Sequence, residues 1–375
     1  MQPVFREALN LSQKGEPFTI ATVVHTKGSS PQKPGAKLLI RQDGSGVGTL
    51  GGGCVEGDIW FAAKEIMREH GGAEYRDYYL NEEIAARDGL VCGGTMYFYL
   101  DPMRTPEDFL PLGHELLEAY QGGDPVSLAT VVNVPDGATN LGAKLLLHYD
   151  GSASGTLGHP DLDARATEVA RLVADLGVTQ HFSTEDGTEV FVEGFTTPPT
   201  LVAVGGGHVG KATADLAHTL GYRVFVVDDR PEFANPQRFP YAEQTIVATY
   251  DQWPNHLSIN VNSFIVVATR GHRYDDMALD SALTTRARYI GLLGSRRKTL
   301  MIYQRLLQAG IPMERLQQVH APIGLDIGAL TPEELAVSIM AEVVMARRGG
   351  KGAPMTMDQW YLDRVGQRAR RTVKV

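Results

Sequence analysis

Cysteine is scarce in this chain: Cys54 and Cys92 are the only two among 375 residues. Two cysteines cannot make the disulfide framework of a small secreted domain. Basic residues are not in excess either, because 35 Lys and Arg stand against 44 Asp and Glu, for a net charge of −9. Nucleic acids and anionic membranes bind basic surfaces, so we expect neither as a partner.

Long apolar runs are also missing. No stretch approaches the ~20 apolar residues of a membrane-spanning helix, and the N-terminal segment has no basic start followed by an apolar run. We therefore expect a cytoplasmic protein. A length of 375 residues with 43% hydrophobic residues is enough for two or three domains.

One segment occurs twice. Residues 21–50 read ATVVHTKGSSPQKPGAKLLIRQDGSGVGTL, and residues 129–157 read ATVVNVPDGATNLGAKLLLHYDGSASGTL. The first copy continues as GGGCVE, with Cys54, and the second as GHPDLD, without cysteine. The counterpart of Cys92 lies in the polar stretch at 183–186. We predict two repeated α+β units, residues 1–105 and a degenerate copy at 106–197.

After the stiff linker Thr197-Pro198-Pro199, short apolar runs alternate with helical stretches. This alternation predicts an α/β domain over residues 198–348, with a Rossmann-like, doubly wound parallel sheet. Thr331 and Glu334 form a capping box that begins its last helix. Residues 349–375 are expected to be a basic, solvated tail. The predicted strands are Leu201–Val204, Arg223–Val227, Gln244–Ala248, Phe264–Ala268 and Tyr289–Leu293.

A G-x-G-x-x-G turn lies between the first of these strands and a helix. Gly205 permits the tight turn, and Gly210 lets helix and sheet pack closely. Gly207, followed by His208, would let the backbone approach a pyrophosphate at the helix N-terminus. Such loops also serve packing alone, so nucleotide binding stays one of two interpretations.

The second strand ends at Asp228, where an acid would bind the ribose of NAD. Asp229 is the competing acid. Arg230 would instead accept the 2′-phosphate of NADP. The choice between NAD and NADP stays open.

Two further loops follow strand ends on the same edge of the sheet. The first is a small, cationic turn that begins with Gly294, Ser295 and Arg296. It would hold a phosphate or another anion. The alternative is that the serine only caps the following helix and the basic residues are solvated. In the second loop, His272 and Asp275 would act together in acid–base chemistry. The alternative is that they only contact each other within the turn.

Each cysteine lies beside glycines, in the turns Gly51–Cys54 and Cys92–Gly94. A helix expected to begin near Asp58 would lower the pKa of the Cys54 thiol. Thiolates are soft ligands that suit transition metals, although two cysteines are too few for a zinc site. Two small buried residues in tight turns are the alternative.

Four stretches together resemble the XdhC/CoxI family, the xanthine dehydrogenase accessory proteins. They are Gly28-Ser29-Ser30-Pro31 with Gly35-Ala36-Lys37, Gly52–Glu56, Val204–Gly210, and Pro322–Gly328 with Thr331–Ile339. The resemblance implies a molybdenum cofactor chaperone rather than an enzyme. Such a protein binds the molybdopterin form, protects it during exchange of an oxo for a sulfido ligand, and delivers it to an apo xanthine dehydrogenase-type hydroxylase. A cysteine desulfurase would be the second partner.

By that resemblance, Cys54 and Cys92 would contact the molybdenum, and Glu56 would hydrogen-bond the pterin. The glycines that would admit the pterin are Gly52, Gly53, Gly93 and Gly94. We expect this site where these turns face the C-terminal edge of the parallel sheet, in a homo-oligomer that encloses the cofactor.

Two other functions compete. An NAD(P)-dependent oxidoreductase would use the loop at Gly205 and the pair His272 and Asp275. A redox-sensing protein would use the two cysteines as a switchable pair. The N-terminal repeats offer His25 and His159, but the sequence does not join them to an acid–base set.

Overall fold

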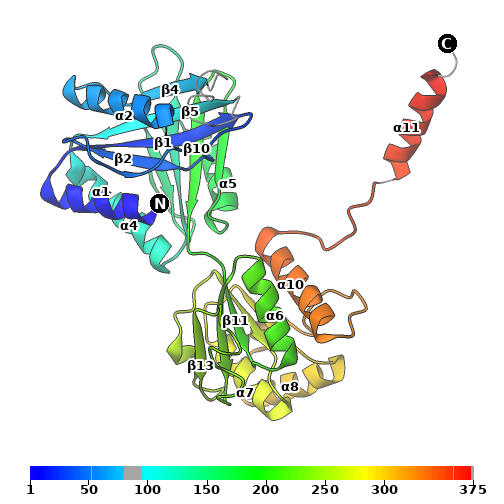
Figure 1. Cartoon of the computed structure of the whole chain (residues 1–375). Helices are drawn as coiled ribbons and strands as arrows, with labels where there is room; N and C mark the ends of the chain where they lie inside the picture. The colour runs from blue at the N-terminus through cyan, green and yellow to red at the C-terminus, as the bar shows by residue number, and fades with distance from the viewer. Residues whose placement is uncertain (52, 80–93, 358, 373–375) are drawn as a thin grey trace.

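The computed structural model describes residues 1–51, 53–79, 94–357 and 359–372, without the side chains of residues 53, 54, 272 and 366–372. It contains two five-stranded antiparallel sheets and one six-stranded parallel sheet. Figure 1 shows the antiparallel sheets together in one lobe, here called the upper lobe, and the parallel sheet in a lower lobe. This is the α/β architecture that the sequence predicts.

The first repeat begins with a helix whose apolar face is buried and continues into a sheet covered by a second helix. Its strand order is β3-β2-β1-β5-β4. The elements are α1 (Gln2–Lys14), β1 (Phe18–Lys27), β2 (Lys37–Arg41), β3 (Gly46–Gly48), α2 (Gly53–Arg68), β4 (Glu74–Tyr79) and β5 (Thr95–Met103).

The second repeat has the same order of elements, and its sheet reads β8-β7-β6-β10-β9. Even the irregularities match, because the β1–β5 and β6–β10 pairings both shift register near their open end. The elements are η1 (Pro106–Phe109), α4 (Leu110–Gln121), β6 (Val126–Asn133), β7 (Lys144–Leu147), β8 (Ala153–Gly155), α5 (Pro160–Ala174), β9 (Thr179–Ser183) and β10 (Glu189–Phe195).

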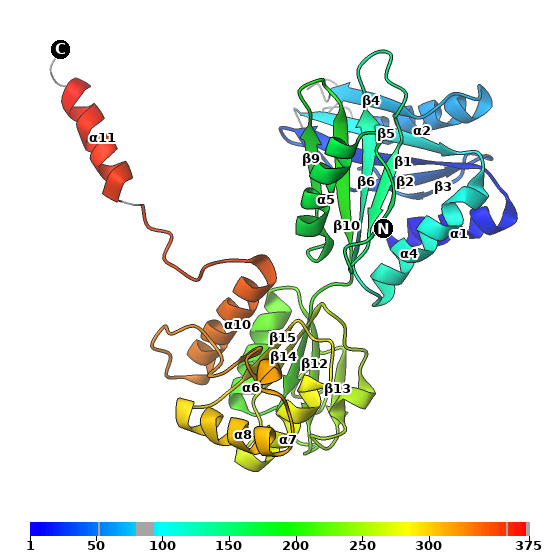
Figure 2. The same ribbon diagram turned by 180° about the vertical axis from the view of Figure 1, so that it is seen from behind.

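The repeated Gly-Ala-Lys segment joins the two sheets. Lys37 pairs with Glu193 of the other repeat, and its counterpart Lys144 pairs with Asp101, both at 2.8 Å. These acids occupy equivalent positions on β10 and β5, so the two repeats are related by an approximate two-fold axis. Helices α1 and α4 pack side by side at one edge of this interface (Figure 2).

The lower lobe is a parallel sheet of order β13-β12-β11-β14-β15-β16, as a doubly wound fold requires. Its strands are β11 (Thr200–Val204), β12 (Arg223–Asp228), β13 (Gln244–Val247), β14 (Ser263–Val267), β15 (Tyr289–Leu292) and β16 (Val319–His320). Its helices are α6 (His208–Thr219), η2 (Trp253–His256), α7 (His272–Leu283), α8 (Arg296–Gln308), α9 (Met313–Leu316) and α10 (Pro332–Arg348).

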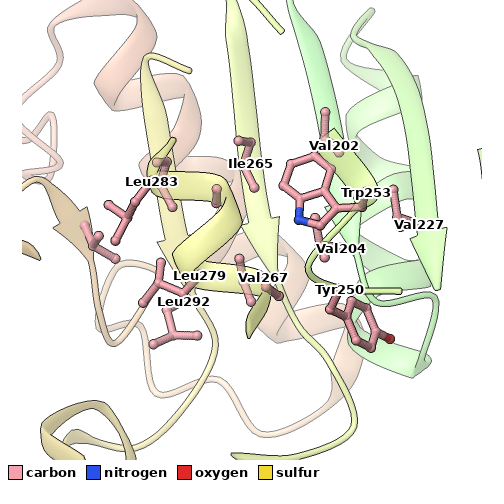
Figure 3. Close-up of a cluster of buried hydrophobic side chains, with 14 of the residues drawn as sticks. Val202, Val204, Val227, Tyr250, Trp253, Ile265, Val267, Leu279, Leu283 and Leu292 are labelled. Carbon is pink, nitrogen blue, oxygen red and sulfur yellow. The ribbon is translucent and has the colours of Figure 1, made fainter. Parts of the chain in front are cut away.

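Central strands β11, β14 and β15 are buried along their whole length, which explains their unbroken apolar sequence. Figure 3 shows one face of this core, where Trp253 and Tyr250 pack over the valines and isoleucine of β11 and β14. The predicted capping box is present, since Thr331 accepts the Glu334 N–H and Glu334 accepts the Thr331 N–H.

The N-terminal ends of the parallel strands face the upper lobe. Asn262, just before β14, donates to the Thr197 carbonyl at 2.8 Å. Arg288, just before β15, pairs with Asp175 of the second repeat at 2.5 Å. The C-terminal ends therefore lie on the far side of the lower lobe (Figure 1). Our expectation that the cysteine turns face the C-terminal edge of the parallel sheet of the same chain is therefore wrong.

Two boundaries also differ from the prediction. Helix α2 begins at Gly53 instead of Asp58, because a glycine at the start of a helix hides the periodic signal. The tail contains a separate helix, α11 (Gln359–Thr372), rather than only an extension. It extends away from both lobes, and its Trp360, Tyr361 and Leu362 are exposed (Figure 1).

Candidate functional site

Gly51 and Gly94, one glycine from each of the two predicted turns, pack against one loop, residues 27–32. Gly94 is buried, and a Cβ there would collide with the carbonyl oxygens of Lys27 and Ser29. Gly51 has a positive φ of 116°, and a Cβ there would lie 2.9 Å from Cγ of Pro31. Segments that are distant in the sequence are thus held against the same loop by close backbone packing.

The backbone of Cys54 lies in the first turn of α2, nearer to the helix N-terminus than predicted. The positive end of a helix dipole stabilises a thiolate at this position. Gly52, Cys92 and Gly93 lie outside the described residues, as do the side chains of Cys54 and Gly53.

Glu56 holds the turn that precedes α2. Its Oε2 accepts the Thr49 hydroxyl at 2.9 Å and the Leu50 N–H at 3.0 Å. Asp163, its counterpart in the second repeat, accepts the equivalent groups at 2.7 and 2.6 Å. Because the copy without cysteine has the same contacts, they belong to the shared scaffold.

A cluster of rings crosses the interface between the repeats. The His25 ring lies 5.4 Å from that of Tyr97 and 4.9 Å from that of His181, and Tyr75 stacks 6.0 Å from Tyr97. Glu189 Oε2 lies 2.7 Å from His181 Nε2 and accepts the Tyr75 hydroxyl at 3.0 Å. We call these five residues the cross-repeat cluster.

The sequence did not reveal this cluster, because its members come from both repeats. One signal was present: His25 in ATVVH aligns with Asn133 in ATVVN, so the copies differ by a titratable residue at one position. Their cross-strand partners, Tyr97 and Glu189, are likewise equivalent. Only the packing of the sheets shows that these positions touch.

Burial and the nearby positive charges lower the pKa of His25, which is therefore neutral at pH 7. Burial alone would raise the pKa of Glu189, but hydrogen bonds from His181, Asn133 and Tyr75 hold it below its usual value. The cluster thus contains a neutral imidazole beside a fixed carboxylate.

At the C-terminal edge of the lower sheet, the Asp228 carboxylate is occupied by hydrogen bonds within the protein. It is fully buried and accepts the Gly206 N–H at 2.9 Å and the Arg230 Nε at 2.9 Å. Burial would raise its pKa, but the bonds from Arg230 and Gly206 hold the pKa below its usual value. Asp228 therefore closes the glycine loop and does not present a free carboxylate to a ribose.

The glycines of this loop divide into two groups. A Cβ at Gly205 would collide with the Ala268 carbonyl, and one at Gly210 with the Gly205 carbonyl, so these two serve packing. Gly207 has no atom near its missing Cβ, and the space beside the N-terminus of α6 and His208 is open.

The competing acid, Asp229, pairs with Arg270 at 2.6 Å. These residues follow β12 and β14, so the ion pair spans the end of β11, where the order of the strands reverses. A nucleotide bound at this edge would meet a formed ion pair.

In the other two loops, at 294–296 and 272–275, some of the predicted side chains already make contacts within the protein. Ser295 accepts the Lys298 N–H at 3.3 Å and caps α8, while Arg296 is exposed and Gly294 precedes the cap. Asp275 is buried against Thr269, at 2.7 Å, and pairs with Lys298. The His272 side chain lies outside the described residues.

Among the described residues, no group of three or more His, Cys, Asp and Glu side chains is placed to hold a metal ion. The predicted metal contacts, Cys54 and Cys92, fall outside that set. None of the described helices combines the length and the apolar character needed to cross a bilayer.

Two family models match this chain. The model for the XdhC and CoxI family matches residues 11–78 and 119–184, one stretch in each repeat. The model for the XdhC Rossmann domain matches residues 201–343, which covers most of the lower lobe. Together they account for both lobes.

Individual proteins are similar over nearly the whole length. A protein of Bacillus subtilis described as a probable xanthine dehydrogenase subunit is 28% identical over 90% of this chain and 96% of its own. The molybdenum cofactor insertion chaperone PaoD of Escherichia coli is 24% identical over 92% and 88%. A solved structure described as a xanthine dehydrogenase from Bacillus halodurans is 25% identical over 92% and 96%, with a TM-score of 0.48. From the matching models in both lobes, the chain belongs to the XdhC and CoxI family.

Proposed function

We propose that this protein is a chaperone that binds the molybdenum cofactor in its molybdopterin form and delivers it to a xanthine dehydrogenase-type hydroxylase. The family and the likeness to a molybdenum cofactor insertion chaperone support this function. The observation that carries it is the packing of Gly51 and Gly94 against the same 27–32 loop, in the repeat that contains both cysteines.

In this proposal the cofactor is cargo, and the chain supplies its ligands. Cys54 and Cys92 would contact the molybdenum, since thiolates are soft donors. The position of Cys54 in the first turn of α2 favours its thiolate. Gly52, Gly53 and Gly93 would leave room for the cofactor to approach the backbone.

Two of the predicted contacts receive a different role. Glu56 spans the turn before α2, and Gly94 packs against the 27–32 loop. We therefore assign both to positioning the cysteine turns and not to contact with the pterin.

Support of cofactor sulfuration belongs to the same proposal. Lys27, Gly28 and Ser29 are exposed, so the loop at the centre of the site faces solvent. A partner would have to cover an oxygen-sensitive cargo there. We propose the hydroxylase, a cysteine desulfurase that supplies the sulfur, and a second copy of this chain as such partners.

The oxidoreductase alternative has less support. Its nucleotide loop would need an acid for the ribose, and Asp228 is buried in bonds to that loop. The open space at Gly207 still leaves room for an NAD or NADP pyrophosphate, so we keep nucleotide binding as a separate, secondary proposal.

The test is anaerobic ultrafiltration with cofactor freshly released from a molybdenum hydroxylase. Wild type, Cys54→Ser and Cys92→Ser would be compared for retained molybdenum and pterin. Asp161→Ser is the matched control, because Asp161 occupies the position of Cys54 in the second repeat and is exposed.

We expect wild type and the Asp161→Ser variant to retain the cofactor and both cysteine variants to lose most of it. Equal retention by all four proteins would contradict the assigned site. No retention by wild type would remove the chaperone function itself.

A further inference from the structure

Three polar groups beside the 27–32 loop lack hydrogen-bond partners among the described residues: the His25 ring nitrogens, the Lys27 ammonium and the Tyr97 hydroxyl. Their contacts are between faces, with Lys27 Nζ 5.5 Å from the Tyr97 ring centre and the rings of His25 and Tyr97 5.4 Å apart. His25 and Lys27 are two residues apart on β1, and Tyr97 is the cross-strand partner of His25. All three side chains therefore lie on one face of the sheet.

By contrast, the polar groups of Glu189, His181 and Tyr75, the other members of the cross-repeat cluster, have hydrogen-bond partners. Glu189 binds His181, Tyr75 and Asn133 at 2.7, 3.0 and 3.2 Å. Asn133 and Glu189 are the second-repeat counterparts of His25 and Tyr97, and they bind each other. The same two positions are thus paired in one repeat and unpaired in the other.

This asymmetry matches the distribution of the cysteines. The unpaired groups belong to the repeat with the cysteine turns, and Lys27 begins the loop that touches Gly51 and Gly94. His25 and Tyr97 are partly buried, and partly buried polar groups in native proteins normally have partners, whereas the Lys27 ammonium beside them is exposed. Two unpaired, partly buried groups beside an exposed cation, at the edge of a candidate site, point to a ligand that pairs with them.

The three groups define the chemistry of that ligand. A neutral imidazole donates one hydrogen bond and accepts another, a phenol donates and accepts, and an ammonium pairs with an anion. A planar heterocycle with polar edge atoms and an anionic substituent satisfies all of them. We propose that His25, Lys27 and Tyr97 bind the polar edge and the anionic group of such a heterocycle, which under the proposed function is the pterin of the molybdenum cofactor.

The identity of the ligand rests on the proposed function, whereas its chemical class rests on these contacts. Glu189 and His181 would not touch the ligand. They hold the ring of His25 in place through the stack, so they are positioning residues.

The experiment uses two probes with the full-length protein: the released cofactor, kept anaerobic, and pterin-6-carboxylate, which is fluorescent, anionic and free of metal. Three variants each remove one proposed contact while keeping the packing. His25→Phe keeps the ring, Lys27→Met keeps the stem, and Tyr97→Phe removes only the hydroxyl. Tyr149→Phe is the matched control, since Tyr149 is exposed in the second repeat and belongs neither to the cross-repeat cluster nor to the proposed ligand contacts.

We expect wild type and the Tyr149→Phe variant to bind pterin-6-carboxylate alike, measured by fluorescence anisotropy. Loss of one hydrogen bond or ion pair to a ligand weakens binding by about tenfold, so each of the other three variants should be weaker by that factor. The Lys27→Met effect should vanish with 6-hydroxymethylpterin, which lacks the carboxylate.

The outcomes separate this inference from the proposed function. Unchanged pterin binding in the three variants would overturn the inference, even where wild type retains cofactor. Weakened pterin binding without cofactor retention by wild type would support the inference and overturn the chaperone function. Failure of wild type to bind either probe would overturn both.

Discussion

Replacing Lys37 with methionine should destabilise the upper lobe far more than the same change at its repeat counterpart, Lys144. Lys37 Nζ lies 2.8 Å from Glu193 Oε1 and 3.2 Å from Thr22 Oγ1, and the two paired side chains are only 4% and 7% exposed. Lys144 makes an ion pair of the same length with Asp101, but those side chains are 28% and 17% exposed.

The expected magnitudes follow from burial. Removing one partner of a buried ion pair leaves an uncompensated charge and costs about 3–5 kcal/mol in the free energy of unfolding. For the more exposed pair, water solvates the remaining Asp101, and the expected cost is about 1 kcal/mol. The Lys37→Met/Glu193→Leu double variant should recover most of the loss, since it removes both charges.

The assay is hydrogen exchange read by mass spectrometry at increasing urea, because peptides from β1 and β6 report on the upper lobe separately from the lower one. Equal destabilisation by Lys37→Met and Lys144→Met would refute the argument from burial. A double variant as unstable as Lys37→Met alone would show that the lost stability came from packing and not from the unpaired charge.

Three other predictions follow from single contacts. Gly94→Ala should cost about 1–3 kcal/mol and reduce cofactor retention, because its Cβ would strike the carbonyls of Lys27 and Ser29; a melting temperature equal to that of wild type would contradict this packing. Asp228→Asn should destabilise the lower lobe by about 3 kcal/mol at pH 7. The folded pKa of Asp228 lies below its unfolded value, so its stabilisation is present at neutral pH and disappears as the pH falls through the folded pKa. The difference in unfolding free energy between wild type and the variant should therefore shrink below about pH 4. Parallel stability curves for the two proteins from pH 7 to pH 3 would argue against this. Arg288→Ala should speed proteolysis of the linker at 196–200 severalfold, because the ion pair with Asp175 holds the lobes together; unchanged cleavage would show that this contact does not restrain them.

Local signals sufficed for much of the fold. The duplication was visible because both copies keep ATVV, GAKLL and GTL, and the structure gives both the same strand order. The five predicted strands of the parallel sheet appeared as apolar runs, although only the central strands β11, β14 and β15 are buried along their whole length and the edge strand β13 is mostly exposed. The capping box at Thr331 was readable because its bonds join residues three apart. Short edge strands such as β9, which are only partly buried, left no such pattern.

From the sequence, the two cysteine turns and the glycine loop at Gly205 were candidates, but their surroundings could not be predicted. Asp228 has the spacing of a ribose-binding acid, yet it is buried in bonds to Gly206 and Arg230. The spacing of residues along the chain does not show which way a carboxylate points or which groups hydrogen-bond to it.

Tertiary structure alone decided where the parts of the site meet. Residues 1–197 determine two similar sheets, but only their packing about an approximate two-fold axis brings His25 to His181 and Lys37 to Glu193. Likewise, the connection between the lobes turns the C-terminal edge of the parallel sheet away from the cysteine turns. Helix caps and strand patterns depend on neighbours a few residues away, which the sequence displays directly. Contacts between repeats and between lobes depend on how whole surfaces fit, and that is settled only when the chain is folded.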